Sequence, residues 1–156
     1  MPYWLKRGKA AEDRLAADRE VRLAVEAMLE EIAARGDAAV RALSGRFDGW
    51  EREDFRLSPA EIEACIAELS AEQLADIAFA QEQVRTFAER QKATLLELEV
   101  ETLPGVTLGH RHVPVNAVGC YVPGGQYPLL ASAHMSVITA KVAGCRRVAT
   151  CAPPFN

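Results

Sequence analysis

The sequence predicts an α/β fold in which N-terminal helices precede strands and one βαβ unit of a parallel sheet. Three observations predict it. Apolar residues recur at helical spacing up to about Lys92, and beyond it they alternate or cluster between prolines and glycines. The last third then reads as a strand, a glycine-rich turn, a helix and a strand. Such a unit implies a right-handed crossover, and a single unit cannot cover both faces of a parallel sheet.

Four helices are expected in the first half. Apolar spacing marks residues 12–34, after which Gly36-Asp37 ends that helix and caps a shorter one that runs to Asp48. Ser58-Pro59-Ala60-Glu61 is a capping box with proline at the first helical position of a third helix. Ser70 caps the fourth, whose apolar residues are expected to face inward: Leu74, Ile77, Ala78, Val84 and Phe87.

Strands follow between residues 95 and 118, interrupted by Pro104-Gly105, Gly109 and Pro114. Residues 129–142, rich in Ala and Ser, are expected to form a helix, and residues 146–152 a short buried strand. The predicted regions are therefore a helical part over 1–93, strands over 94–120 that complete the visible part of a first domain, and the start of a Rossmann-like domain over 121–156.

The 156 residues suffice for one modest domain that buries roughly two-thirds of its unfolded surface. A net charge of −4 gives no electrostatic reason to expect nucleic acid or an anionic membrane as partner. No signal peptide or membrane-length apolar segment is recognisable, so the chain is expected to be cytoplasmic. The cysteines show no C-x-x-C spacing and are expected to be buried, reduced hydrophobes: Cys65, Cys120, Cys145 and Cys151.

Acidic residues are confined to the first two-thirds of the chain. All 22 Asp and Glu residues lie at or before Glu101. The later segment therefore contains no carboxylate that could act as a general base, hold a ribose or bind a metal. We expect no catalytic residue and no metal ligand set in this chain.

The segment from Val118 to Pro128, Val-Gly-Cys-Tyr-Val-Pro-Gly-Gly-Gln-Tyr-Pro, places an apolar strand directly before a Pro-Gly-Gly turn and a helix. Two glycines let the backbone approach a ligand closely, and the free N–H groups of the helix start face the same place. The glycine spacing matches neither the dinucleotide fingerprint nor a P-loop. A structural turn and a ligand-contacting turn both remain open, and the ring of Tyr121 could stack on a planar cofactor.

The other candidate site residues also have purely structural explanations. His110-Arg111-His112 could chelate a metal from one face of a strand or could simply be solvated, and His134 could face a ligand or fill a polar gap. Ser132 and Ser136 show no hydrolase triad. Three basic residues more simply mark a helix end and a strand start than a phosphate site: Lys141, Arg146 and Arg147.

Several motifs together resemble the histidinol dehydrogenase family. They are Val118 to Gly125, then Lys141-Val142-Ala143-Gly144 and Cys151-Ala152-Pro153-Pro154. Upstream, Ala34 to Ala39, Arg46-Phe47-Asp48-Gly49 and Leu103-Pro104-Gly105-Val106 agree with its helices and lead-in strands. The resemblance runs from about Val21 to the last residue.

The resemblance implies a zinc-containing, NAD-dependent oxidoreductase that converts an alcohol through an aldehyde to a carboxylate. It implies an intertwined homodimer with two Rossmann-like domains, the second of which would begin at about residue 121. Contact with NAD would fall to Tyr121, with Pro123, Gly124 and Gly125 shaping the approach. The family's Glu-His acid–base pair and its Gln, His and Asp zinc ligands match no segment here.

The expected protein is therefore an N-terminal piece of a longer enzyme, inactive alone. Ala133-His134-Met135-Ser136 looks more like relatives that act on other hydroxylated substrates, such as sulfopropanediol dehydrogenase, than like enzymes of histidine biosynthesis that oxidise histidinol. The alternative is a non-catalytic helical and βαβ module that pairs with another chain.

Overall fold

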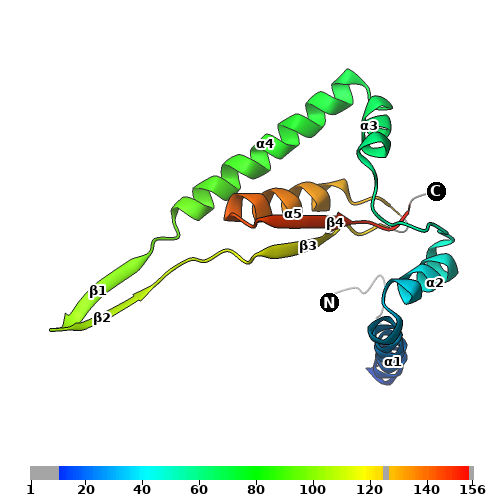
Figure 1. Ribbon diagram of the computed structural model, residues 1–156, viewed down its shortest axis with the longest axis horizontal. Coiled ribbons are helices and arrows are strands. Elements are labelled where there is room, and N and C mark those ends of the chain that lie inside the picture. Colours follow the sequence, from blue (N-terminus) through cyan, green and yellow to red (C-terminus); the bar gives the residue numbers. More distant parts are fainter. Residues whose placement is uncertain (1–10, 125–126, 155–156) are drawn as a thin grey trace, which may run out of the picture. The chain divides into compact units, whose positions relative to one another are not determined.

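The computed structural model describes residues 11–124 and 127–154. The chain divides after Phe55 into two compact units, which are shown with the rest of the fold in Figure 1. This division falls inside the helical region predicted over 1–93, and the boundaries predicted at 93 and 120 stay predictions. No described helix is long and apolar enough to cross a membrane.

The first unit is a helical hairpin of α1 (Ala11–Arg35) and α2 (Asp37–Asp48). The two helices pack together and bury Ala39 completely. The helix break predicted at Gly36-Asp37 is confirmed, with Gly36 at φ 57° in the left-handed region. The predicted cap is wrong in detail, because Gly36 is the N-cap without a side-chain bond and Asp37 is already helical.

The second unit begins with α3 (Pro59–Ala67) and α4 (Ala71–Ala93), and both predicted caps are confirmed. The Ser58 hydroxyl accepts a hydrogen bond from the Glu61 amide, and the Glu61 carboxylate accepts one from the Ser58 amide. Ser70 and Gln73 repeat this reciprocal box at the start of α4. Each box satisfies two amides that a helix start leaves without partners.

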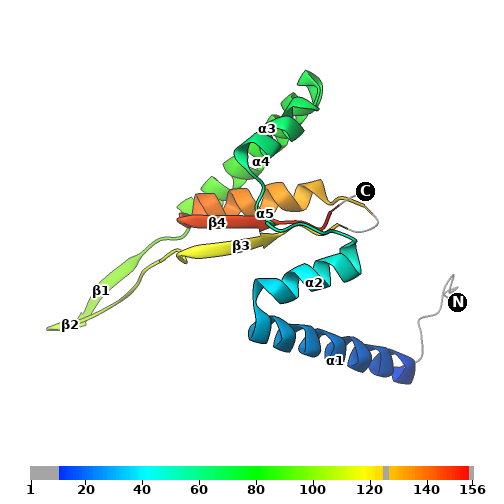
Figure 2. The same cartoon turned by 45° about the vertical axis from the view of Figure 1, so that its right-hand side comes forward.

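An antiparallel hairpin of β1 (Leu98–Leu103) and β2 (Val106–His110) follows, turning at Gly105 with φ 79°. Its register places Val100 opposite Leu108 and Glu101 opposite Thr107, so one face is apolar and the other polar. The hairpin packs against no other described helix or strand. In Figures 1 and 2 it extends beyond the end of the other sheet.

The βαβ unit is formed by β3 (Ala117–Tyr121), α5 (Leu130–Ala143) and β4 (Arg147–Cys151). The strands pair in parallel, with Ala117 opposite Arg147 and Tyr121 opposite Cys151, so the predicted parallel sheet is confirmed. Helix α5 lies between this sheet and α4, as Figures 1 and 2 show. The Lys92 ammonium donates a hydrogen bond to the Val142 carbonyl (2.8 Å), which joins the end of α4 to the end of α5.

Little of the described surface is buried. Few hydrophobic side chains are buried among the described residues, and half of them are alanines: Ala39, Ala88, Cys120, Val122, Ile138 and Ala140. The expectation of one domain that buries two-thirds of its surface is therefore wrong. The predicted α/β architecture is present, but most of its apolar faces lack a second layer.

Several side chains predicted to be buried are exposed for the same reason. Within α4, Phe87 is 66% exposed and Leu74 is 39% exposed. Strand β4 is mostly exposed rather than buried, and among the cysteines only Cys120 is buried. Periodicity identifies the apolar face of an element, but a side chain is buried only where another element covers that face.

Candidate functional site

Tyr121 is the last residue of β3, at the carboxyl end of a parallel strand. Its neighbours Cys120 and Val122 are buried at 3% and 9% exposure, whereas Tyr121 itself is 63% exposed. Because side chains alternate along a strand, Tyr121 lies on the sheet face opposite α5. Ligands of open α/β sheets bind beyond the carboxyl ends of the strands, which is where this ring lies.

The open sheet face beside Tyr121 carries small side chains. Register places Gly119 opposite Ala149 and Tyr121 opposite Cys151, and all four are exposed. A flat group could therefore approach this part of the sheet without meeting a bulky side chain. The prediction that a single βαβ unit leaves one sheet face uncovered is confirmed.

Two backbone hydrogen bonds hold the described residues on either side of the turn after β3. The Val122 amide donates to the Cys151 carbonyl (2.8 Å), which extends the parallel ladder beyond Tyr121. The Leu129 amide donates to the Pro123 carbonyl (3.3 Å), which closes the loop at the start of α5. No side chain caps this helix at Leu129, and the Ser132 amide donates to the Leu129 carbonyl (2.9 Å).

Gly124 is in close contact with the segment that follows β4. A Cβ at this position would lie 2.6 Å from Cγ of Pro153 and 3.3 Å from its Cδ. Any side chain at 124 would therefore displace the proline ring. This gives Gly124 a packing role whether or not a ligand also contacts it, and Gly125 lies outside the described residues.

Pro153 is the member of this site to which the sequence analysis gave no site role. It was quoted there only within Cys151-Ala152-Pro153-Pro154, one of the motifs of the family resemblance. The parallel register brings Cys151 beside Tyr121, and two further residues on each strand bring Pro153 beside the turn. Had the register been known, a glycine after β3 and a proline at the corresponding position after β4 would have indicated this contact.

The three histidines lie in two places. His134 is half-buried in α5, whereas His110 is the last residue of β2 and His112 follows it two residues later. Both of the latter rings contact the Leu96 carbonyl through Nε2, at 3.0 Å and 3.3 Å. Among the described residues, no three His, Cys, Asp or Glu side chains lie close enough together to hold a metal ion by side chains alone.

The remaining candidate residues have structural roles or lie exposed at the ends of elements. The Ser136 hydroxyl donates to the Ser132 carbonyl (2.6 Å), a bond within α5. Lys141 lies in the last turn of α5, Arg147 begins β4, and both are exposed along with Arg146. The predicted helix end and strand start are therefore confirmed.

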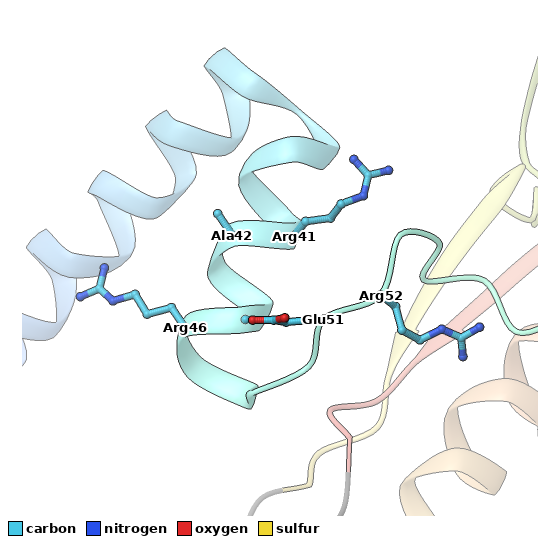
Figure 3. A pocket seen from close by; sticks show the side chains of 6 residues that line it. Arg41, Ala42, Arg46, Glu51 and Arg52 are labelled. Atoms are coloured by element: carbon cyan, nitrogen blue, oxygen red, sulfur yellow. The ribbon is translucent and has the colours of Figure 1, made fainter.

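The first unit contains an open depression of about 570 Å³ beside α2, shown in Figure 3. Arg41, Arg46 and Arg52 line it, but their guanidinium groups point in different directions. Arg41 donates through Nε to the Glu53 carbonyl (2.7 Å), and Arg46 lies 4.8 Å from the ring centre of Phe47. The arginines therefore do not converge on a common anion.

The chain is similar to histidinol dehydrogenases and their homologues. A "Histidinol dehydrogenase homolog 1" from Mesorhizobium japonicum is 62% identical over 133 residues, covering 85% of this chain and 27% of the relative. A "Sulfopropanediol 3-dehydrogenase" from Ruegeria pomeroyi is 46% identical over 151 residues, covering 97% of this chain and 34% of the relative.

A crystal structure of histidinol dehydrogenase from Elizabethkingia anophelis shares the fold with a TM-score of 0.74 at 28% identity. It matches 96% of this chain, which corresponds to 32% of that protein. The chain thus spans about a third of the length of the relatives it matches. The family model described as histidinol dehydrogenase matches residues 11–156, and the chain belongs to the histidinol dehydrogenase family.

Proposed function

We propose that this chain forms one side of the NAD site in an oxidoreductase of the family, which oxidises an alcohol through an aldehyde to a carboxylate. The observation that carries the proposal is the exposed ring of Tyr121 at the carboxyl end of β3. Membership of the histidinol dehydrogenase family supports the proposed reaction class. NAD, when bound, would accept hydride from the substrate carbon.

The described residues fit a planar cofactor at this place. The ring of Tyr121 offers an apolar stacking surface beside a sheet face of small side chains. The uncapped start of α5, where the Leu129 amide is held on the Pro123 carbonyl, suits the negative charge of a pyrophosphate. In this proposal Tyr121 positions the cofactor, and Pro123, Gly124 and Gly125 determine how closely it approaches.

The described residues do not offer a ligand set for the catalytic zinc of the proposed enzyme. The residues described contain no cluster of three candidate ligands, and residues 102–156 contain no Asp or Glu. We therefore assign the zinc ligands and the acid–base residues of the proposed enzyme to sequence outside these 156 residues. The chain alone is expected not to oxidise alcohols with NAD and zinc, and robust turnover would overturn this assignment.

The substrate is proposed to be histidinol or a related hydroxylated compound such as sulfopropanediol. One relative at 46% identity is named for sulfopropanediol, and His134 precedes Met135 in the helix that follows the cofactor turn. Side-by-side assays of the longer protein with both alcohols would separate the two.

The proposed enzyme is a cytoplasmic homodimer.

A titration of the longer protein with NAD tests the cofactor proposal. Tyr121→Ala should weaken binding several-fold to about tenfold, because the stacking surface is lost, whereas Tyr121→Phe should retain most of it. Tyr127→Ala is the matched control, since Tyr127 is 74% exposed and carries no role in the proposal. Unchanged affinity in Tyr121→Ala would remove this ring from the site.

A second candidate function is a non-catalytic module that pairs with another chain. The apolar hairpin face favours it, with Leu103 66% exposed and Leu108 56% exposed. Size-exclusion chromatography with light scattering on this chain is the first test. A well-behaved monomer would count against both the module and the piece-of-an-enzyme proposals, because both leave apolar faces that need a cover.

A further inference from the structure

Two imidazoles converge on one backbone carbonyl at the open end of the β1–β2 hairpin. Nε2 of His110 lies 3.0 Å from the Leu96 oxygen, and Nε2 of His112 lies 3.3 Å from the same atom. The two rings are edge-on, with centroids 5.4 Å apart and planes at 75°. Three potential ligand atoms therefore face one small volume.

The strand register explains this convergence. Leu98 pairs with His110 at the last step of the ladder, and continuing the same antiparallel count places Leu96 opposite His112. His110 and His112 are two residues apart, so in an extended chain their side chains leave the same face. The Leu96 carbonyl, which begins the approach to β1, is contacted by these side chains rather than by the ladder.

The spacing of these atoms matches that within a metal coordination shell. Imidazole nitrogen binds zinc at about 2.0–2.1 Å, so neighbouring ligands lie roughly 2.8–3.0 Å apart in an octahedral shell and roughly 3.3–3.4 Å apart in a tetrahedral one. The two nitrogen–oxygen distances, 3.0 Å and 3.3 Å, are close to these separations. A metal ion held by these three atoms would replace the two contacts that the rings now make with the carbonyl.

Charge near the site does not oppose a cation. Arg111, between the two histidines, projects to the other face of the strand, where its guanidinium lies 4.0 Å from the Glu99 carboxylate. On the side of the histidines, the register brings Leu98 and Leu108. The neighbouring guanidinium therefore points away from the place where the cation would bind.

We propose that His110, His112 and the Leu96 carbonyl bind one divalent transition-metal ion of the class that prefers imidazole, with water at the remaining positions. The ion would join the residue that leads into β1 to the residues that end β2. It would thereby close the open end of a hairpin that no other described element supports. This site is separate from the proposed catalytic zinc and does not depend on the NAD proposal.

The test is a calorimetric titration of the 156-residue chain, free of any affinity tag, with Ni²⁺. One ion should bind per chain, and His110→Ala or His112→Ala should each weaken binding about tenfold or more, since each removes a direct ligand. His134→Ala is the matched control, because this histidine lies in α5. Equal affinity in the wild type and His112→Ala would overturn the proposal.

Exposed thiols are the main competing ligands. Cys65 and Cys151 are exposed, so the titration is repeated in a Cys65→Ser/Cys151→Ser background, where binding should persist. A nuclear magnetic resonance map in the same background locates the ion without any histidine variant. Paramagnetic Cu²⁺ should broaden the amides around Leu96 and the end of β2 first. Loss of binding in this background, or broadening centred elsewhere, would contradict the site.

Discussion

The ring of Pro153 occupies the space that a side chain at Gly124 would need. A Cβ on Gly124 would come within 2.6 Å of Pro153 Cγ, closer than real Cβ contacts come. The obstacle belongs to a proline ring, which cannot swing away as the end of a flexible side chain could. The close approach of Gly124 to Pro153 is thus possible only because residue 124 has no side chain.

Gly124→Ala is therefore expected to destabilise the second unit by roughly 1–3 kcal/mol, the usual cost of overpacking. Urea unfolding of the chain measures this cost. Gly119→Ala is the matched control, because a Cβ on that β3 glycine would meet nothing within 4 Å. The double variant Gly124→Ala/Pro153→Ala should recover part of the loss, and strict additivity of the two single changes would contradict the contact.

Gly109→Ala is expected to break the β1–β2 ladder. Its Cβ would lie 2.2 Å from the Leu98 carbonyl oxygen, a backbone atom that can move only if the strands separate. Amide hydrogen exchange across β1 and β2 should become much faster than in the wild type. Thr107→Ala, on the same face two residues away, serves as the control. Wild-type protection in Gly109→Ala would show that the strands are not paired as described.

Ser58→Ala and Ser70→Ala should each cost about 1 kcal/mol of stability, because each removes the hydroxyl that satisfies an amide at a helix start. Replacement by Asp keeps an acceptor at the same place and should restore most of the loss. Circular dichroism during urea unfolding is the measurement. A cost for Ala equal to that for Asp would argue against the capping role.

Lys92→Met should lower stability by roughly 0.5–1 kcal/mol, since it removes both a hydrogen bond to the Val142 carbonyl and a positive charge at the end of α5. The loss should shrink at high salt, because the ammonium is exposed. Arg90→Met, in the same last turn of α4, is the control. Equal effects of the two changes at low salt would indicate a general charge effect rather than this bond.

The local signals in the sequence predicted the elements well. The capping boxes at Ser58 and Ser70 and the helix break at Gly36 depend on residues within one helical turn. The parallel pairing of β3 and β4 followed from the order strand, helix, strand. The resemblance to the family rested on short motifs such as Val118 to Gly125, and the family is now shown.

Burial and the contact at Gly124 could not be predicted in the same way. Phe87 has the spacing of a core residue, yet it is 66% exposed, because no described element covers that side of α4. The contact between Gly124 and Pro153 depends on the register of two strands far apart in sequence. Tyr121 was chosen from its motif, and its open position on the uncovered face follows only from the way α5 packs.

The pairing of β3 with β4 also sets an order of assembly during synthesis. The β1–β2 hairpin is local and can pair soon after it leaves the ribosome, whereas Ala117 must wait for Arg147, thirty residues later. Until residue 147 has been synthesised, Cys120 and Val122, which are buried in the folded protein, have no partner strand beside them. Until β4 is available, this apolar side of β3 is therefore a place where the unfinished chain can associate with other chains.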